Sequence, residues 1–321
     1  MPTLAPPITR PPRTPKTTTS RANEATKFAR FQSLEFLREQ ERIQRVWRRL
    51  HEAGLHPILV KGWSTGRLYP APGERKCCDV DLCFPLDEIP RVLELQAEFP
   101  LDFILIDIHG GLPDLPGRSW EDVYARTREI PLADCAIRIL GWEDHLRLTC
   151  HHLLRHGARS RKWLRDVAMI VNALPDDFDW DECLRGPRHE AEWVLTLVGV
   201  AQRLFDAQVQ DERIRRLSHR VPNWLFNALP KIWEAGIDKH PLGYYFRNLA
   251  AAWQALCFRY LNGVRAAAEM GRVPQTRLGL AVSIAKFFVA RRIPTLFRHP
   301  WERLKGNTRH DRAAEAKWVH Y

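Results

Sequence analysis

The feature that most constrains the fold is a change in the spacing of apolar residues near residue 140. Before it, short apolar segments at 57–60, 78–84 and 101–109 indicate strands, and residues 87–99 have the spacing of a helix. From Trp142 onward, apolar residues recur at helical spacing. Strands that alternate with a helix indicate an α/β layer. We therefore predict an α+β chain, in which a small mixed-sheet domain is followed by an all-helical domain.

The expected boundaries follow from composition and helical spacing. Six prolines fall within the first 15 positions, a composition that buries little apolar surface. A helix is expected over about Ser33–Ala53, because its apolar residues recur at helical spacing and Gly54 is a common type of helix stop. The prediction is a disordered basic tail, an α/β domain, a helical domain and a C-terminal tail, at residues 1–25, 26–140, 141–305 and 306–321.

The composition excludes several classes of protein. Hydrophobic residues make up 45% and charged residues 27% of 321 positions, which excludes a wholly disordered chain, a collagen-like fibre and a small disulfide scaffold. The longest apolar run, Leu278–Ala290, contains Lys286 and is shorter than the roughly 20 residues of a membrane-spanning helix. Seven cysteines without framework spacing are typical of a reducing compartment. We therefore expect a cytoplasmic protein with no transmembrane segment.

The net charge of +11 is concentrated at the two ends of the chain. Residues 1–50 carry 11 Lys/Arg against 4 Asp/Glu, residues 259–321 carry 13 against 4, and the segment between them carries 25 against 30. Within the second basic end, Leu278–Leu304 mixes apolar residues with Lys286 and four arginines. Peripheral contact of this helix with an anionic membrane or nucleic acid is one expectation, and packing on the protein itself is the other.

Two carboxylates flank Val80 on the second strand-like segment. Because side chains alternate along a strand, Asp79 and Asp81 would share one face, while Cys78 and Val80 would pack on the other. Neighbouring carboxylates repel each other unless a cation offsets their charge, and oxygen ligands suit Mg²⁺. The alternative interpretation of this pattern is a polar strand face in water.

Two further features bear on the same chemistry. Gly62 follows the apolar segment at 57–60 and precedes Ser64, and such a turn lets backbone N–H groups and a hydroxyl approach a phosphate. Asp107 ends a later apolar strand, where a charge is costly unless it is paired, metal-bound or exposed. If that strand lies beside the strand of Asp81, three carboxylates converge and can hold two metal ions, with Asp107 also placed to act as a general base.

Short motifs follow one another in order over residues 30–185. Those of the first half are Leu59-Val60-Lys61-Gly62, Leu68-Tyr69-Pro70, Gly73-Glu74-Arg75, Asp79-Val80-Asp81-Leu82 and Asp107-Ile108-His109. Those of the helical half are Glu143-Asp144-His145-Leu146, His151-His152-Leu153, His156-Gly157, Asp166 and Asp179-Trp180. As an ordered set they resemble the bacterial group of uncharacterised nucleotidyltransferases in the polymerase-β-like nucleotidyltransferase superfamily.

The resemblance implies transfer of a nucleoside monophosphate from an NTP to an acceptor hydroxyl, with release of pyrophosphate. It implies two Mg²⁺ ions, or Mn²⁺ in their place, bound by three carboxylates that also carry the catalysis: Asp79, Asp81 and Asp107. It implies nucleotide binding by four residues: Lys61, Gly62, Ser64 and Arg75. One departure is that Trp63 separates Gly62 from Ser64, whereas the wider superfamily has Gly-Ser or Gly-Gly after the strand.

Several alternatives stay open. The acceptor is unidentified, as is the preferred NTP. A non-catalytic accessory protein that binds a nucleotide or RNA on the same fold is the second interpretation, and a toxin-like enzyme acting on RNA is the third. The three carboxylates favour an enzyme. His145, His152 and His156 share a helix face but lack the glutamate spacing of a zinc protease helix, so we expect them to pack or to line the acceptor site.

Overall fold

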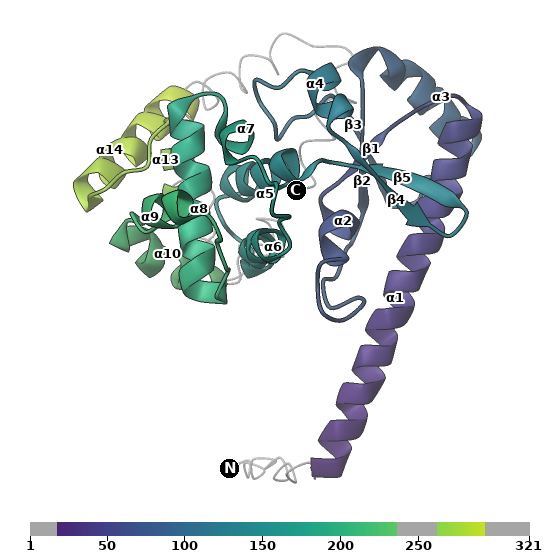
Figure 1. Cartoon of the computed structure of the whole chain (residues 1–321), viewed down its shortest axis with the longest axis horizontal. Coiled ribbons are helices and arrows are strands. Elements are labelled where there is room, and N and C mark those ends of the chain that lie inside the picture. Colours follow the sequence, from purple (N-terminus) through teal and green to yellow (C-terminus); the bar gives the residue numbers. More distant parts are fainter. Residues whose placement is uncertain (1–17, 236–261, 293–321) are drawn as a thin grey trace, which may run out of the picture.

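The computed structural model describes residues 18–235 and 262–292. A mixed sheet with strand order β3-β2-β1-β5-β4 forms the first half (Figure 1). Its strands are β1 (Ile58–Val60), β2 (Val80–Phe84), β3 (Ile106–Gly110), β4 (Arg128–Leu132) and β5 (Cys135–Ile139). β2 pairs antiparallel with β1 and parallel with β3, while β5 pairs parallel with β1 and antiparallel with β4. The α+β class with a mixed sheet is confirmed.

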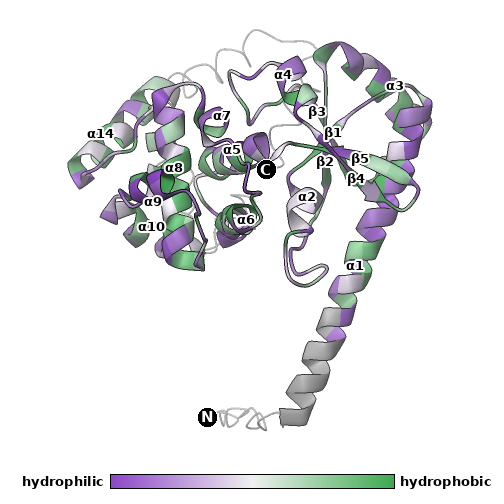
Figure 2. Cartoon of the chain, in the orientation of Figure 1, coloured by the Kyte–Doolittle hydropathy of each residue, from purple (hydrophilic) through white to green (hydrophobic). Residues whose placement is uncertain are grey.

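Two helices pack against one face of the sheet. The helices of this half are α1 (Thr18–Glu52), α2 (Gly62–Gly66), α3 (Ile89–Glu98) and α4 (Trp120–Ala125). Apolar residues of α1 and α3 share one buried core with alternate strand residues: Ile43, Val46, Trp47, Leu50, Val80, Leu82, Phe84 and Val92. Hydrophobic and hydrophilic residues alternate along the helices (Figure 2), as expected where one helix face is buried. The first part of α1 projects beyond the sheet and begins at Thr18, within the segment predicted as a tail (Figure 1).

The opposite face of the sheet carries a smaller core and the polar site. Ile58, Val60 and Cys83 pack there against Leu115 and Leu148. Leu115 lies between β3 and α4, and Leu148 belongs to α5 (Trp142–Arg155) of the helical half. Side chains alternate along a strand, so Asp81 shares this face with Cys83. The helical half therefore approaches the face on which the acidic residues lie.

The second half is helical, as predicted. Besides α5 it contains α6 (Arg161–Asn172), α7 (Trp180–Leu184), α8 (Arg188–Phe205), α9 (Glu212–Ser218), α10 (Asn223–Ala235), α13 (Gly263–Glu269) and α14 (Arg277–Phe287), followed by a π-helical turn, Phe288–Arg292. A continuous apolar core joins these helices and is built from their inward residues, such as Leu153, Val167, Trp193 and Leu197. Apolar spacing in the sequence also predicts a helix at about 242–270, and residues 242–261 of it lie outside the described residues.

Three local expectations differ from the structure. β2 begins at Val80 and not at Cys78, which is exposed. β3 begins at Ile106, because residues 101–105 form turns that end at Leu105 with a φ of 59°. The β4–β5 hairpin, absent from the sequence prediction, extends the sheet beyond β1. Its two strands contain six apolar and three charged residues, and Pro131 interrupts the first strand, so the sequence signal for a strand is weak there.

The described part of the C-terminal basic segment is α14 and the turn after it. Leu278, Val282 and Val289 are exposed there, while Phe287 is buried. In the described ranges no helix combines the length and apolar character needed to cross a bilayer. Residues 293–304 of the predicted basic helix lie outside the described residues, and its contact with an anionic membrane or nucleic acid stays a prediction.

Candidate metal and nucleotide site

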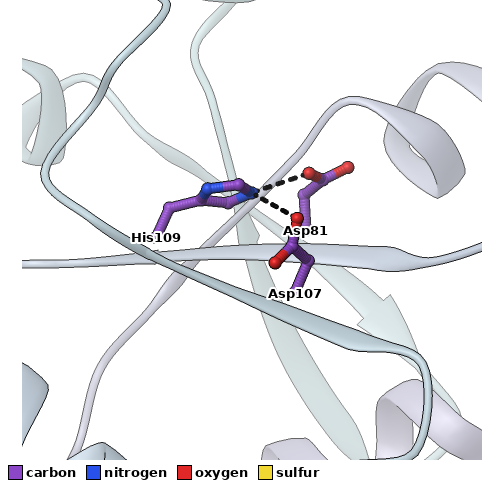
Figure 3. Close-up of side chains that lie close together, drawn as sticks. All are labelled: Asp81, Asp107 and His109. Carbon is purple, nitrogen blue, oxygen red and sulfur yellow. Dashed lines mark hydrogen bonds and ion pairs between the residues drawn. The ribbon is translucent and has the colours of Figure 1, made fainter. Parts of the chain in front are cut away.

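Asp81 and Asp107 face each other across two parallel strands. The register pairs Asp81 with Asp107 and Cys83 with His109, so two residues of β3 reach the face that carries Asp81. His109 Nε2 lies 2.8 Å from Asp81 Oδ1 and 3.3 Å from Asp107 Oδ2. Figure 3 shows the imidazole edge directed at both carboxylates. The parallel pairing of β2 with β3 thus brings together groups that are 26 residues apart in the chain.

Asp81 is ionised despite its burial. Lys61 Nζ lies 3.1 Å from Asp81 Oδ1, on the side of β1. Burial alone would raise the pKa of Asp81, but the hydrogen bond with His109 and the charge of Lys61 outweigh burial and lower this pKa to about 2. Burial acts to lower the pKa of Lys61, but the charges of Asp81 and Asp114 raise it overall, so the ammonium stays protonated.

The donor set of this site fits a divalent cation. One ligand atom from each of Asp81, Asp107 and His109 lies within 4.8 Å of the other two. In the described part of the chain, this is the one group of three or more such residues close enough to share an ion. Two carboxylates suit Mg²⁺ and Mn²⁺, and an imidazole nitrogen adds a ligand type that transition metals accept readily. The residues present are therefore compatible with metal binding.

The turn after β1 lies at the same end of the sheet. Val60 pairs with Asp81, and α2 begins two residues later at Gly62. Between them, Lys61 has a φ of 56° and a ψ of −130°, a conformation that non-glycine residues rarely adopt and that costs about 1–3 kcal/mol. The Ser64 hydroxyl donates to the Lys61 carbonyl at 2.6 Å. The structure therefore places Lys61 and Gly62 beside the acidic group, with the Ser64 hydroxyl turned back toward the backbone of the turn.

Two of the predicted site residues, Asp79 and Arg75, are not members of the acidic group. Asp79 immediately precedes β2 and is not a member of the Asp81–Asp107–His109 group. Arg75 is buried and donates from Nε and Nη2 to Asp166 of α6 at 2.9 Å. Its guanidinium therefore joins the two halves of the protein in this structure.

His109 and Asp114 lie at this site, although the sequence interpretation assigned a role to neither of them. His109 was visible as the second residue after Asp107, at the spacing that returns a strand side chain to the same face. Asp114 lies in the segment between β3 and α4, where no periodicity marks it. It is buried, and it lies 3.5 Å from Lys61 Nζ and 3.1 Å from His152 Nδ1.

Two other histidines of the helical half, His145 and His156, are held by protein contacts. His145 Nε2 lies 2.9 Å from the Thr65 hydroxyl on α2, and burial lowers the pKa of His145 to about 3. His156 packs against His152 and Trp163 at ring-centroid distances of 4.5 and 5.2 Å. His145, His152 and His156 therefore all make protein contacts, and their lining of an acceptor site stays a prediction.

Residues 8–99 match a family model described as an uncharacterised nucleotidyltransferase. This segment, less than a third of the chain, is therefore similar to the uncharacterised nucleotidyltransferase family. The match covers α1, the turn after β1 and the strand of Asp81, and so confirms the resemblance seen in the motifs. Asp107 and His109 lie beyond the matched residues. No curated protein and no solved structure matched the chain.

Proposed function

We propose that this chain is a metal-dependent nucleotidyltransferase that transfers a nucleoside monophosphate from an NTP to an acceptor hydroxyl. The observation that carries the proposal is the in-register pairing of Asp81 with Asp107, which gathers them with His109 beside the turn of Lys61. Two carboxylates in contact with one imidazole and next to an ammonium form a site for a cation and a polyphosphate together. The family match over residues 8–99 supports the same reaction class.

Asp107 and Lys61 have different roles in the proposed reaction. The acceptor oxygen attacks the α-phosphorus, the bond from that phosphorus to the β-phosphate oxygen breaks, and pyrophosphate leaves. Asp107 is the more exposed carboxylate, at 36% against 11% for Asp81, so it is placed to take the proton of the acceptor hydroxyl. Lys61 supplies positive charge for the leaving phosphates. Bound Mg²⁺, or Mn²⁺, would neutralise phosphate charge and lower the pKa of the hydroxyl.

The identity of the metal and the number of bound ions are part of the proposal. The Asp81–Asp107–His109 group offers ligands for one ion. A second ion, as the resemblance implies, would draw on Asp79, and Gly62, Ser64 and Arg75 stay predictions for nucleotide contact. The acceptor and the preferred base are left for experiment.

Labelled nucleotide transfer tests the proposed function. Each α-³²P-labelled NTP is incubated with the purified chain, Mg²⁺ or Mn²⁺, and a cell lysate. We expect one class of macromolecule or metabolite to become labelled, with pyrophosphate release that falls about a hundredfold or more in Asp81→Asn and Asp107→Asn. Asp134→Asn, at an exposed acid of the β4–β5 turn, is the matched control and retains transfer. Unchanged transfer in Asp81→Asn would remove this site from the mechanism.

The same assay separates the alternatives. Metal-dependent NTP binding without transfer or pyrophosphate release indicates the non-catalytic accessory protein. Label that is released by ribonuclease but not by protease indicates RNA as the acceptor, as the toxin-like interpretation requires. Label released by protease indicates a protein acceptor.

A further inference from the structure

Lys61 is held between two carboxylates from different parts of the fold. Its Nζ lies 3.1 Å from Asp81 Oδ1 and 3.5 Å from Asp114 Oδ2. Asp81 belongs to the candidate metal group, whereas Asp114 does not. The Lys61 side chain is only 12% exposed, so few water molecules compete for the ammonium. The position of this charge is therefore set by the balance between Asp81 and Asp114.

Asp114 is itself fixed from the helical half. Arg155 Nη1 lies 3.1 Å from its Oδ1, and His152 Nδ1 lies 3.1 Å from its Oδ2. Both partners are on α5, one turn apart on the same helix face. Burial would raise the pKa of Asp114, but its bond with His152 and the nearby charges lower it below the usual range, so the carboxylate is ionised.

The ammonium and a divalent cation compete for the same oxygen. A lysine paired with Asp81 neutralises one of the two carboxylates that a metal ion needs. A second buried carboxylate on the far side of the ammonium weakens that competition, because it shares the positive charge. It also holds the ammonium beside the site, where an incoming polyphosphate meets it.

We infer that Asp114 is a positioning residue that acts through Lys61: it draws the ammonium away from Asp81, leaves Asp81 for the metal ion and holds Lys61 for the phosphates of the nucleotide. The inference rests on the proposed function, because it concerns the same metal site. Because His152 and Arg155 of α5 hold Asp114, the arrangement of charges at the site depends on how α5 packs against the sheet. The helical half then has a direct part in metal binding.

Mn²⁺ binding in the absence of nucleotide tests this arrangement. Free Mn²⁺ is counted by electron paramagnetic resonance in titrations of wild type, Asp114→Asn, Lys61→Met and the double variant. We expect Asp114→Asn to weaken Mn²⁺ binding about tenfold, as loss of a group that orients a metal ligand typically does. In the Lys61→Met background the same change should cost much less, because no ammonium remains to move. Equal losses in both backgrounds would overturn the inference.

A second variant gives an effect of opposite sign. Arg155→Gln removes one competing cation from Asp114 at a partly exposed position, so the fold is retained and Asp114 attracts Lys61 more strongly. We expect Mn²⁺ to bind about twofold more tightly, and weaker binding in Arg155→Gln would contradict the inference even if Asp114→Asn fails to fold. Asp166 joins the two halves through Arg75 and Tyr69 and makes no contact with Asp114 in these bonds. Asp166→Asn is therefore the control for a loosened contact between the two halves. If wild type binds no Mn²⁺, the proposed function fails; if it binds without this coupling, only the role of Asp114 fails.

Discussion

Arg75 donates to both carboxylate oxygens of Asp166, which lies 91 residues later in the chain on α6. Both side chains are at least 94% buried, and the Tyr69 hydroxyl donates to the same carboxylate at 2.7 Å. The bond joins the segment before β2 to the helical half. Burial removes both ions from water, so loss of either partner would leave the other charge buried and unpaired.

Removal of one partner of this pair should destabilise the whole protein. We expect Asp166→Asn to lower the free energy of unfolding by about 3–5 kcal/mol, because the Arg75 charge stays buried without its partner. Arg75→Lys should also destabilise, because lysine lacks the planar fork that contacts two oxygens. Urea unfolding measures both. The exposed Arg48–Asp134 pair is the control, and Arg48→Gln should destabilise the protein far less than either of these variants.

Mn²⁺ should stabilise the folded chain without any nucleotide. An ion that binds only the folded state adds about 2.7 kcal/mol at a concentration of 100 times its dissociation constant. We expect Mn²⁺ to raise the melting temperature of wild type and to leave that of Asp107→Asn and His109→Ala nearly unchanged. Addition of EDTA should reverse the shift. An equal shift in all three proteins would place the ion elsewhere.

Gly62→Ala should weaken nucleotide binding without destabilising the fold. A Cβ added at Gly62 would lie 3.5 Å from the Asp79 carbonyl and 3.6 Å from Cys77 Sγ, which are ordinary contact distances. The melting temperature should therefore change little. If the backbone of this turn approaches a phosphate, the added methyl group obstructs it, and NTP affinity should fall about tenfold or more. Calorimetric titration with a non-hydrolysable NTP measures the affinity.

Gly73→Ala is the contrasting variant for that experiment. Gly73 has a φ of +75°, and an added Cβ would lie 2.1 Å from the Gln32 carbonyl oxygen on α1. We expect this variant to lose stability whatever its effect on nucleotide. Intact NTP affinity in Gly62→Ala would show that the turn does not hold a phosphate closely.

The order of elements was readable from local patterns, whereas the composition of the site was not. Apolar spacing located β1, α3 and most helices of the second half, because each buries one continuous face. The convergence of Asp81 with Asp107 depended on strand order, and the motif resemblance supplied that expectation. Asp79 lies immediately before β2 and is not a member of the Asp81–Asp107–His109 group, so its part in metal binding stays a prediction.

The charged partners of Asp114 and Arg75 could not be predicted from the sequence for a different physical reason. Asp114 sits in an irregular segment, so its partners Lys61, His152 and Arg155 are set by how the two halves dock. Arg75 was predicted from its motif as a nucleotide contact, and that role stays a prediction while the structure shows its bond to Asp166. A charged side chain pairs with whichever opposite charge the fold brings near, and sequence spacing does not record that choice.

Glu39 should make stability fall as the pH rises. It lies on α1 and is 7% exposed, and burial raises its pKa to about 7, although a hydrogen bond with Cys77 and the charge of Arg75 act in the other direction. In the unfolded chain this pKa returns to about 4.5. Between these values the unfolded state loses the proton first, so stability present below pH 4.5 is lost progressively up to about pH 7.

Glu39→Gln should remove this dependence because the amide carries no proton to lose. A pKa difference of this size corresponds to about 3 kcal/mol at most, so the variant should gain up to that much over wild type at pH 8 and little at pH 4. Urea unfolding at both pH values measures the difference. Glu41→Gln, at an exposed position of the same helix, should follow wild type. A constant difference between Glu39→Gln and wild type across this range would show that Glu39 ionises at its ordinary pKa.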